Sequence, residues 1–134
     1  MAIQILLADD EKDFVDTLAE RLRIRDFSVR VVYNGLDAVA AVKEARPAVA
    51  ILDLFMPGLP GDETLRQITA LYHDLPIILL TGQAGVEESF ASQELANCTC
   101  LTKPVALSQL LEQIESMLQA RKQTQDEAGG ACHV

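Results

Sequence analysis

Residues 49–61 read VAILDLFMPGLPG, and this stretch decides the fold. It includes all but the first residue of the apolar run Ala48–Leu54, which only Asp53 interrupts. Met56-Pro57-Gly58 follows and carries turn chemistry. Continuous apolar runs of this length suit strands that are buried on both faces of a parallel sheet. The stretch therefore predicts a buried strand that ends near an acidic residue and a turn.

The same alternation of apolar runs and amphipathic segments continues on both sides of this stretch. Four more runs are mostly rich in Val, Ile or Leu: Ile3–Ala8, Phe27–Val32, Pro76–Leu80 and Cys98–Leu101. Between and after the runs, apolar residues recur at helical spacing. They are Phe14, Leu18 and Leu22 over roughly 11 to 25, then Val39 and Val42, Leu65 and Ile68, Val86 and Phe90, and finally Leu107, Leu110, Leu111, Ile114 and Leu118. Five strands thus alternate with five helices.

This alternation predicts an α/β fold, a doubly wound five-stranded parallel sheet with helices on both faces, because parallel strands are joined by right-handed crossovers. Ligands of such sheets bind beyond the carboxyl ends of the strands. We expect residues 1–120 to form one domain. Residues 121–134 lose the apolar period, and we expect a polar, flexible C-terminal tail there.

Composition excludes several classes of protein. The chain has 134 residues, and no apolar run approaches the roughly 18 residues of a membrane span. The start of the chain lacks a secretory signal, so we expect a soluble, cytoplasmic protein without a membrane partner. The formal net charge of −9 argues against direct nucleic-acid binding. Three cysteines without a secretion signal argue against disulfides, and a zinc site would have to combine residues from this set: Cys98, Cys100, Cys132, His73 and His133.

Polar residues follow four of the predicted strands. Asp9 and Asp10 follow the first, Asp53 ends the third, Thr81 ends the fourth and Lys103 follows the fifth. If the first and third strands are neighbours, three carboxylates converge, and each pair repels by about 1–4 kcal/mol. Such a cluster needs a cation, and oxygen ligands with water access favour Mg²⁺. A carboxylate can act as a nucleophile toward phosphorus, with Lys103 and the metal neutralising the phosphoryl oxygens and Thr81 donating its hydroxyl to them.

The motifs LLADDE, VAILDLFMPGLPG, IILLTG and CLTKP occur in the order, spacing and strand context of bacterial two-component response regulators. Over residues 3 to 120 the chain resembles their receiver domains, including the chemotaxis regulators. The resemblance implies strand order 2-1-3-4-5 in a flavodoxin-like (βα)₅ fold. It also implies a cis peptide between Lys103 and Pro104.

Residue by residue, the resemblance makes Asp53 the phosphoacceptor of a Mg²⁺-dependent signalling switch. It implies that Asp10, Asp53 and the backbone carbonyl of Phe55 bind Mg²⁺ directly, and that Asp9 acts through water. Thr81 and Lys103 would bind the phosphoryl group. Such a protein catalyses its own phosphorylation and dephosphorylation, and we expect no multiple-turnover enzyme.

The resemblance also implies partners. The phosphodonor would be the phosphohistidine of a sensor histidine kinase or phosphotransfer protein in a phosphorelay. The output would be a changed surface on the fourth helix, fifth strand and fifth helix, read by a downstream protein or by a second copy in a homodimer. At the position of Cys100 receiver domains usually carry Tyr or Phe, so we expect this surface to respond differently or weakly. In similar proteins the positions of Phe55 and Gln83 flank the path of the hydrolytic water, and we hypothesise that Phe55 shields the acyl phosphate.

Other interpretations of the same residues stay open. Asp9 and Asp10 are suited to cap the following helix, as is Thr81, and Lys103 alone suits a solvated position. An aspartate-nucleophile phosphatase needs a second carboxylate two residues after Asp53, where Phe55 stands. A flavodoxin-like electron carrier needs a Ser-, Thr- and Gly-rich loop after the first strand. The main alternative is a receiver-like interaction module that does not depend on phosphorylation.

Overall fold

The computed structural model describes residues 3–56, 58–82 and 98–130, the last eleven of them by backbone alone. Residues 1–104 and 105–134 form two compact units, which are described separately. The strands of the first unit are β1 (Gln4–Ala8), β2 (Ser28–Val32), β3 (Val49–Asp53), β4 (Ile77–Thr81) and β5 (Cys98–Thr102). Its helices are α1 (Lys12–Ile24), α2 (Gly35–Glu44) and α3 (Gly61–Leu71). Each strand starts and ends within one or two residues of its predicted apolar run.

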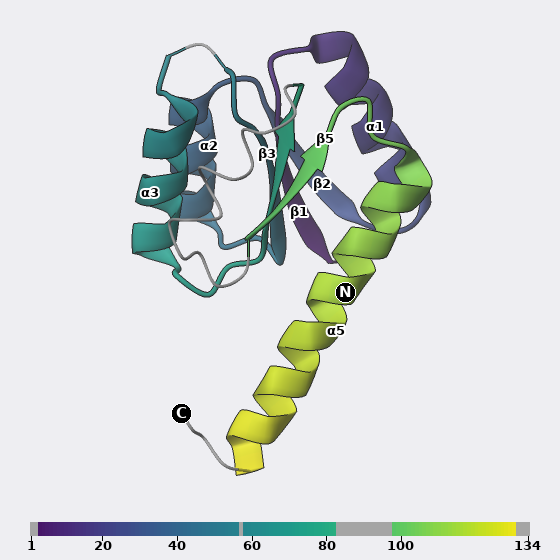
Figure 1. The fold of residues 1–134 in the computed structure, drawn as a ribbon, viewed down its shortest axis with the longest axis vertical. Helices are drawn as coiled ribbons and strands as arrows, with labels where there is room; N and C mark the ends of the chain where they lie inside the picture. Colours follow the sequence, from purple (N-terminus) through teal and green to yellow (C-terminus); the bar gives the residue numbers. More distant parts are fainter. Residues whose placement is uncertain (1–2, 57, 83–97, 131–134) are drawn as a thin grey trace. The chain divides into compact units, whose positions relative to one another are not determined.

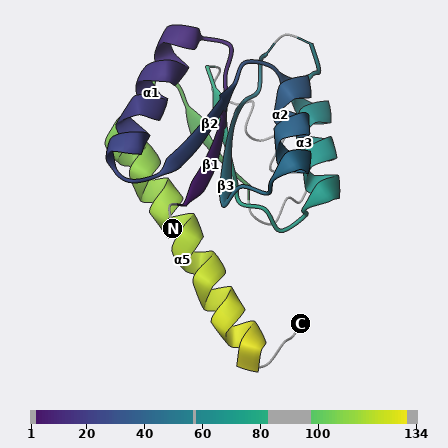
Figure 2. The same cartoon turned by 180° about the vertical axis from the view of Figure 1, so that it is seen from behind.

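The five strands form one parallel sheet in the order β2-β1-β3-β4-β5. This confirms the predicted fold class and strand order. α2 and α3 cover one face of the sheet and α1 lies on the other, as both views show (Figures 1 and 2). Every residue of β3 and β4 is buried, as continuous apolar runs in the middle of a covered sheet require.

Alternate residues of each strand point to opposite faces, which divides the apolar side chains between two layers. On the α2 and α3 face, strand residues such as Ala50 and Leu52 share one cluster with helix residues such as Val39 and Ile68. Cys98 and Cys100 pack against this cluster as small apolar groups. On the α1 face the helix buries Val15, Leu18, Ala19 and Leu22.

The turn after β3 is fixed by the start of α3. Gly61 is the first residue of α3, and a Cβ at this position would overlap the backbone carbonyl of Leu54. A backbone carbonyl in a buried turn cannot move aside as the end of a flexible side chain can. Only glycine therefore allows α3 to begin this close to the end of β3, beside the predicted phosphoacceptor.

We expect Gly61→Ala to lower the free energy of unfolding by about 1–3 kcal/mol, the usual cost of overpacking a filled site. The measurement is the urea unfolding midpoint, followed by circular dichroism. Gly82→Ala is the matched control, because a Cβ there meets no atom of the described residues within 4 Å. Equal midpoints for Gly61→Ala and the wild type would contradict the close approach.

The second unit contains α5, a single helix over Leu107–Gly130. The backbone of residues 121–130 is helical and continues α5, in the region where the sequence leads us to expect a polar, flexible tail. Residues 119–128 are rich in Gln, Ala, Arg, Lys and Glu, which favour helix without an apolar stripe. Residues 131–134 and the predicted fourth helix lie outside the described residues, and the division at residue 120 stays a prediction.

None of the helices in the described ranges is long and apolar enough to cross a membrane.

Candidate functional site

The pairing of β1 with β3 brings two acidic stretches together. Ala8 lies opposite Leu52, so Asp9 and Asp53 follow at the same edge on neighbouring strands. One carboxylate oxygen from each of Asp9, Asp10 and Asp53 lies within 4.8 Å of the others. The predicted convergence of the three carboxylates is thus present in the structure.

The three carboxylates differ in their access to solvent. Asp9 is fully buried and Asp53 is 5% exposed, while Asp10 is exposed. Burying a carboxylate is costly unless it is paired or hydrogen-bonded. Backbone N–H groups supply part of the compensation: Glu11 donates to Asp9 Oδ1 at 2.9 Å and Phe55 donates to Asp53 Oδ1 at 3.0 Å.

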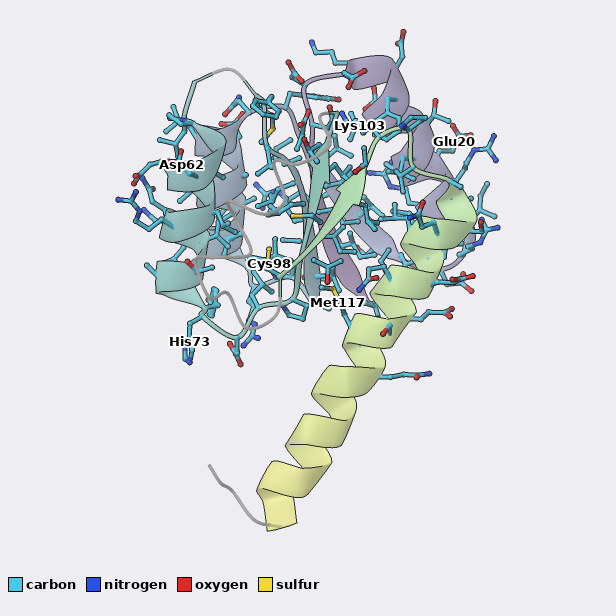
Figure 3. The ribbon with its side chains drawn as sticks, in the orientation of Figure 1. Glu20, Asp62, His73, Cys98, Lys103 and Met117 are labelled. Atoms are coloured by element: carbon cyan, nitrogen blue, oxygen red, sulfur yellow. The ribbon has the colours of Figure 1, made fainter. Side chains whose placement is uncertain are left out.

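Lys103 supplies the positive charge. Its Nζ lies 2.8 Å from Asp9 Oδ2 and 3.2 Å from Asp53 Oδ2, and its side chain is 15% exposed. Within the described residues it is the only cation paired with either carboxylate. The interpretation of Lys103 as a solvated side chain is therefore wrong, because its ammonium is paired with two buried carboxylates. Figure 3 shows Lys103 and Cys98 at opposite ends of β5.

Glu11, the N-cap of α1, and Phe14 in its first turn also contact Lys103, and neither contact is predicted from the sequence. Glu11 Oε1 lies 2.6 Å from Lys103 Nζ, and the Phe14 ring centroid lies 5.1 Å from it. The position of Glu11 directly after Asp9-Asp10 was the available signal. The helix-capping interpretation of the aspartates finds no support, since α1 begins after Glu11 without a side-chain cap.

Burial and neighbouring charges shift the pKa values of Asp53 and Lys103. Burial raises the pKa of the Asp53 carboxyl, and the charge of Asp9 adds to this, while the Phe55 N–H and Lys103 oppose it. Burial by itself would favour a neutral Lys103, but its contacts with Asp9 and Glu11 and the nearby charge of Asp53 raise its pKa. Lys103 is therefore a cation at neutral pH.

The remaining predicted residues lie at the same edge. Thr81 is fully buried at the end of β4, and its carbonyl accepts a hydrogen bond from the backbone N–H of Lys103 at 2.7 Å. Phe55 is 55% exposed. A cavity of about 360 Å³ opens here, lined by Asp10, Glu11, Asp53, Phe55, Gly82 and Lys103. The peptide between Lys103 and Pro104 is cis, as the resemblance implies. Gln83 lies outside the described residues, as does any helix that Thr81 would cap.

The donor set fits a hard divalent cation. Asp9 Oδ2 is buried and accepts no hydrogen bond of good geometry from the described residues. Its one charged partner among these residues is Lys103. Three carboxylates facing one ammonium leave uncompensated negative charge beside a water-accessible cavity. Mg²⁺ takes one or two carboxylates and keeps several waters, which matches this arrangement.

The zinc site considered for the cysteines and histidines has no counterpart among the described residues. Among the residues that the structure describes, Asp9, Asp10 and Asp53 are the one cluster of three or more metal-binding groups. Burial, with a smaller contribution from neighbouring Cys100, raises the pKa of the Cys98 thiol to about 12. A thiol is a poor ligand until it loses its proton. Cys132 and His133 lie outside the described ranges.

Comparison with known proteins decides the family. The model of the response regulator receiver domain matches residues 5–115. The chain belongs to this family. It is 33% identical over 128 residues to the response regulator MprA of Mycobacterium ulcerans, covering 96% of the chain and 55% of the relative. It is also 33% identical over 130 residues to MprA of Mycolicibacterium vanbaalenii, with coverage of 97% and 55%. This receiver domain thus spans about half the length of those relatives.

Solved structures show the same fold for the receiver domain. A CheY-like receiver domain protein of Methanospirillum hungatei superposes with a TM-score of 0.85 at 24% identity, covering 92% of this chain and 99% of the other. NtrX of Brucella abortus gives a TM-score of 0.86 at 25% identity and covers 98% of this chain and 30% of its own. Family membership argues against the hydrolase and electron-carrier alternatives, and identifies the chain as the receiver domain of a two-component response regulator.

Proposed function

We propose that this receiver domain is a Mg²⁺-dependent phosphoacceptor that takes a phosphoryl group onto Asp53. The observation that carries the proposal is the meeting of Asp9, Asp10 and Asp53 with Lys103 at one edge of the sheet. These residues come from three strand ends that are distant in sequence. A structural role alone needs no exposed third carboxylate and no open cavity beside them.

Asp10, Asp53 and the carbonyl of Phe55 would hold the ion directly, and Asp9 would hold it through water. When bound, Mg²⁺ supplies positive charge to the carboxylates and to the phosphoryl oxygens. The buried Oδ2 of Asp9 and the exposed position of Asp10 support this assignment. Asp9 would provide a buried carboxylate and Asp10 a solvent-accessible one to the same hydrated cation.

The transfer itself requires little covalent chemistry from the protein. An oxygen of Asp53 attacks phosphorus, and the bond between phosphorus and the donor imidazole nitrogen breaks. The bonding electrons stay on that nitrogen, which takes up a proton, and Asp53 becomes an acyl phosphate. Lys103 then donates to the phosphoryl oxygens, and the hydroxyl of Thr81 turns toward them.

The donor in this proposal is the phosphohistidine of a sensor histidine kinase or phosphotransfer protein. The phosphoryl group brings a charge of about −1.5 to −2 in place of the single negative charge of the Asp53 carboxylate, and this change reorganises the groups around the site. The output is a changed surface formed by the fourth helix, β5 and α5, read by a downstream protein or a second copy. Cys100 favours the alternative of a phosphorylation-independent module, because an aromatic ring usually occupies its position.

Intact mass measurement tests the proposal against its alternatives. The protein is incubated with a small phosphodonor with and without Mg²⁺. A base-labile gain of one phosphate that requires Mg²⁺ supports the switch. No gain under any condition supports the interaction module, and release of many equivalents of inorganic phosphate per chain supports a hydrolase.

Phe55 is expected to prolong the life of the acyl phosphate. Its exposed ring lines the cavity beside Asp53, where it limits the approach of water. We expect Phe55→Asn to lose phosphate about threefold faster, a barrier change of roughly 0.7 kcal/mol. Decay is followed by intact mass after the donor is removed, with Phe55→Leu as an apolar control. Equal or slower decay in Phe55→Asn would remove the shielding hypothesis.

A further inference from the structure

Glu11 is bound to the functional site but does not belong to its carboxylate cluster. Its Oε1 makes the shortest contact of Lys103, at 2.6 Å, and its side chain is 62% exposed. The described cluster whose oxygens lie within 4.8 Å contains Asp9, Asp10 and Asp53, and Glu11 is outside it. A divalent ion held by those three residues therefore leaves the charge of Glu11 at the mouth of the cavity.

The three carboxylate partners of Lys103 differ in what their loss would cost. Asp9 is fully buried, so loss of the Lys103 ammonium would leave its carboxylate as a buried charge without a charged partner among the described residues. Asp53 is 5% exposed and loses its charge when it becomes an acyl phosphate. Glu11 is solvated and can give up Lys103 at little cost. Glu11 therefore neutralises Lys103 in the resting protein without being required for the integrity of the site.

The cavity gives Glu11 a second effect. Among the described residues, six line it. Three of these are acidic, Asp10, Glu11 and Asp53, and Lys103 is the one cation. A phosphodonor that enters this cavity is itself an anion and meets the charge of Glu11. A donor carried on a protein can bring cationic side chains of its own to pair with Glu11, whereas a small diffusing donor cannot.

We propose that Glu11 is a specificity-determining residue that selects against small anionic phosphodonors through its charge at the mouth of the cavity. The inference rests on the proposed function of Asp53 as phosphoacceptor. Glu11→Gln keeps an oxygen for Lys103 and removes only the charge. The variant is expected to react faster with a donor of two negative charges, such as acetyl phosphate, by about fivefold at low salt.

Two further readouts separate charge from structure. Phosphoramidate carries less net negative charge, so the gain in Glu11→Gln is expected to be smaller with this donor than with acetyl phosphate. Because salt screens exposed charges, the gain is also expected to shrink as the ionic strength rises toward 0.5 M. Glu20→Gln is the matched control, with the same change of net charge at an exposed position on α1. Figure 3 shows Glu20 along α1, apart from Lys103.

Initial phosphorylation rates of the full chain with Mg²⁺ are measured by intact mass for the wild type and both variants. A gain limited to Glu11→Gln, larger for the more highly charged donor and reduced by salt, supports the inference. Equal rates in the wild type and Glu11→Gln, an equal gain in Glu20→Gln, or a slower Glu11→Gln would overturn it. A wild type that takes no phosphate from either donor contradicts the proposed function and this inference with it.

Discussion

Asp53→Asn is expected to abolish phosphorylation of the chain by any donor. The amide lacks the negatively charged oxygen that attacks phosphorus, and no other carboxylate in the described residues lies at the end of the central strand β3. Intact mass should stay unchanged after incubation with Mg²⁺ and acetyl phosphate, while the wild type gains one phosphate. Phosphorylation of the variant at the wild-type rate would show that another residue is the acceptor.

Although Asp53→Asn is expected to lose phosphorylation, it is also expected to gain stability, and this gain tests the electrostatics of the site. Burial and the charge of Asp9 raise the pKa of Asp53, so the folded state disfavours the charged carboxylate. An aspartate whose pKa is higher in the folded than in the unfolded protein destabilises the folded state at neutral pH. This destabilisation decreases as the pH falls toward the pKa of the unfolded state, about 3.9. We therefore expect Asp53→Asn to unfold at a higher urea concentration than the wild type in Mg²⁺-free buffer at pH 7.

Asp62→Asn is the matched control for both measurements. Asp62 lies exposed in the first turn of α3, apart from Lys103 in Figure 3, and its loss changes the net charge equally. We expect normal phosphorylation and no gain in stability for this variant. A stability gain shared by both variants would attribute the effect to overall charge, and not to repulsion within the site.

Lys103→Met is expected to slow phosphorylation by about 100-fold or more, the usual cost of removing one donor that stabilises transition-state charge. The methionine keeps most of the apolar stem and removes the ammonium that pairs with Asp9 and Asp53. Single-turnover rates with acetyl phosphate and saturating Mg²⁺ give the measurement. An unchanged rate would show that Lys103 serves only to neutralise the resting site.

Stability separates these two roles of Lys103. Removing one partner of a buried ion pair costs about 3–5 kcal/mol, and Asp9 has no exposed surface through which water could compensate. We expect Lys103→Met to unfold at lower urea concentration, and Mg²⁺ to restore part of the loss because it brings another positive charge. Lys103→Arg, which keeps the charge, should stay closer to the wild type in stability. A destabilised variant that Mg²⁺ does not rescue would contradict a shared cation site.

Much of the arrangement of the site was predictable because residues that follow parallel strands in the sequence lie at one edge of the sheet. Asp9, Asp53, Thr81 and Lys103 each end or follow an apolar run, and parallel strands all present these ends at one edge. The contacts of Glu11 and Phe14 with Lys103 were not predictable. They depend on the direction in which α1 leaves β1 and on the rotamer of Lys103, which is 92 residues from Glu11 along the chain.

The sequence by itself determined the periodicity, the alternation of five strands with helices and the residues at the strand ends, because burial patterns and turn residues are local signals. It did not determine the backbone of residues 121–130, since good helix formers extend a helix without any apolar stripe. Only the tertiary structure decided which carboxylates are buried, which oxygen lacks a hydrogen bond and which partners share Lys103. Those properties depend on distances of a few ångströms between strands, and such distances are set by packing and not by spacing along the chain.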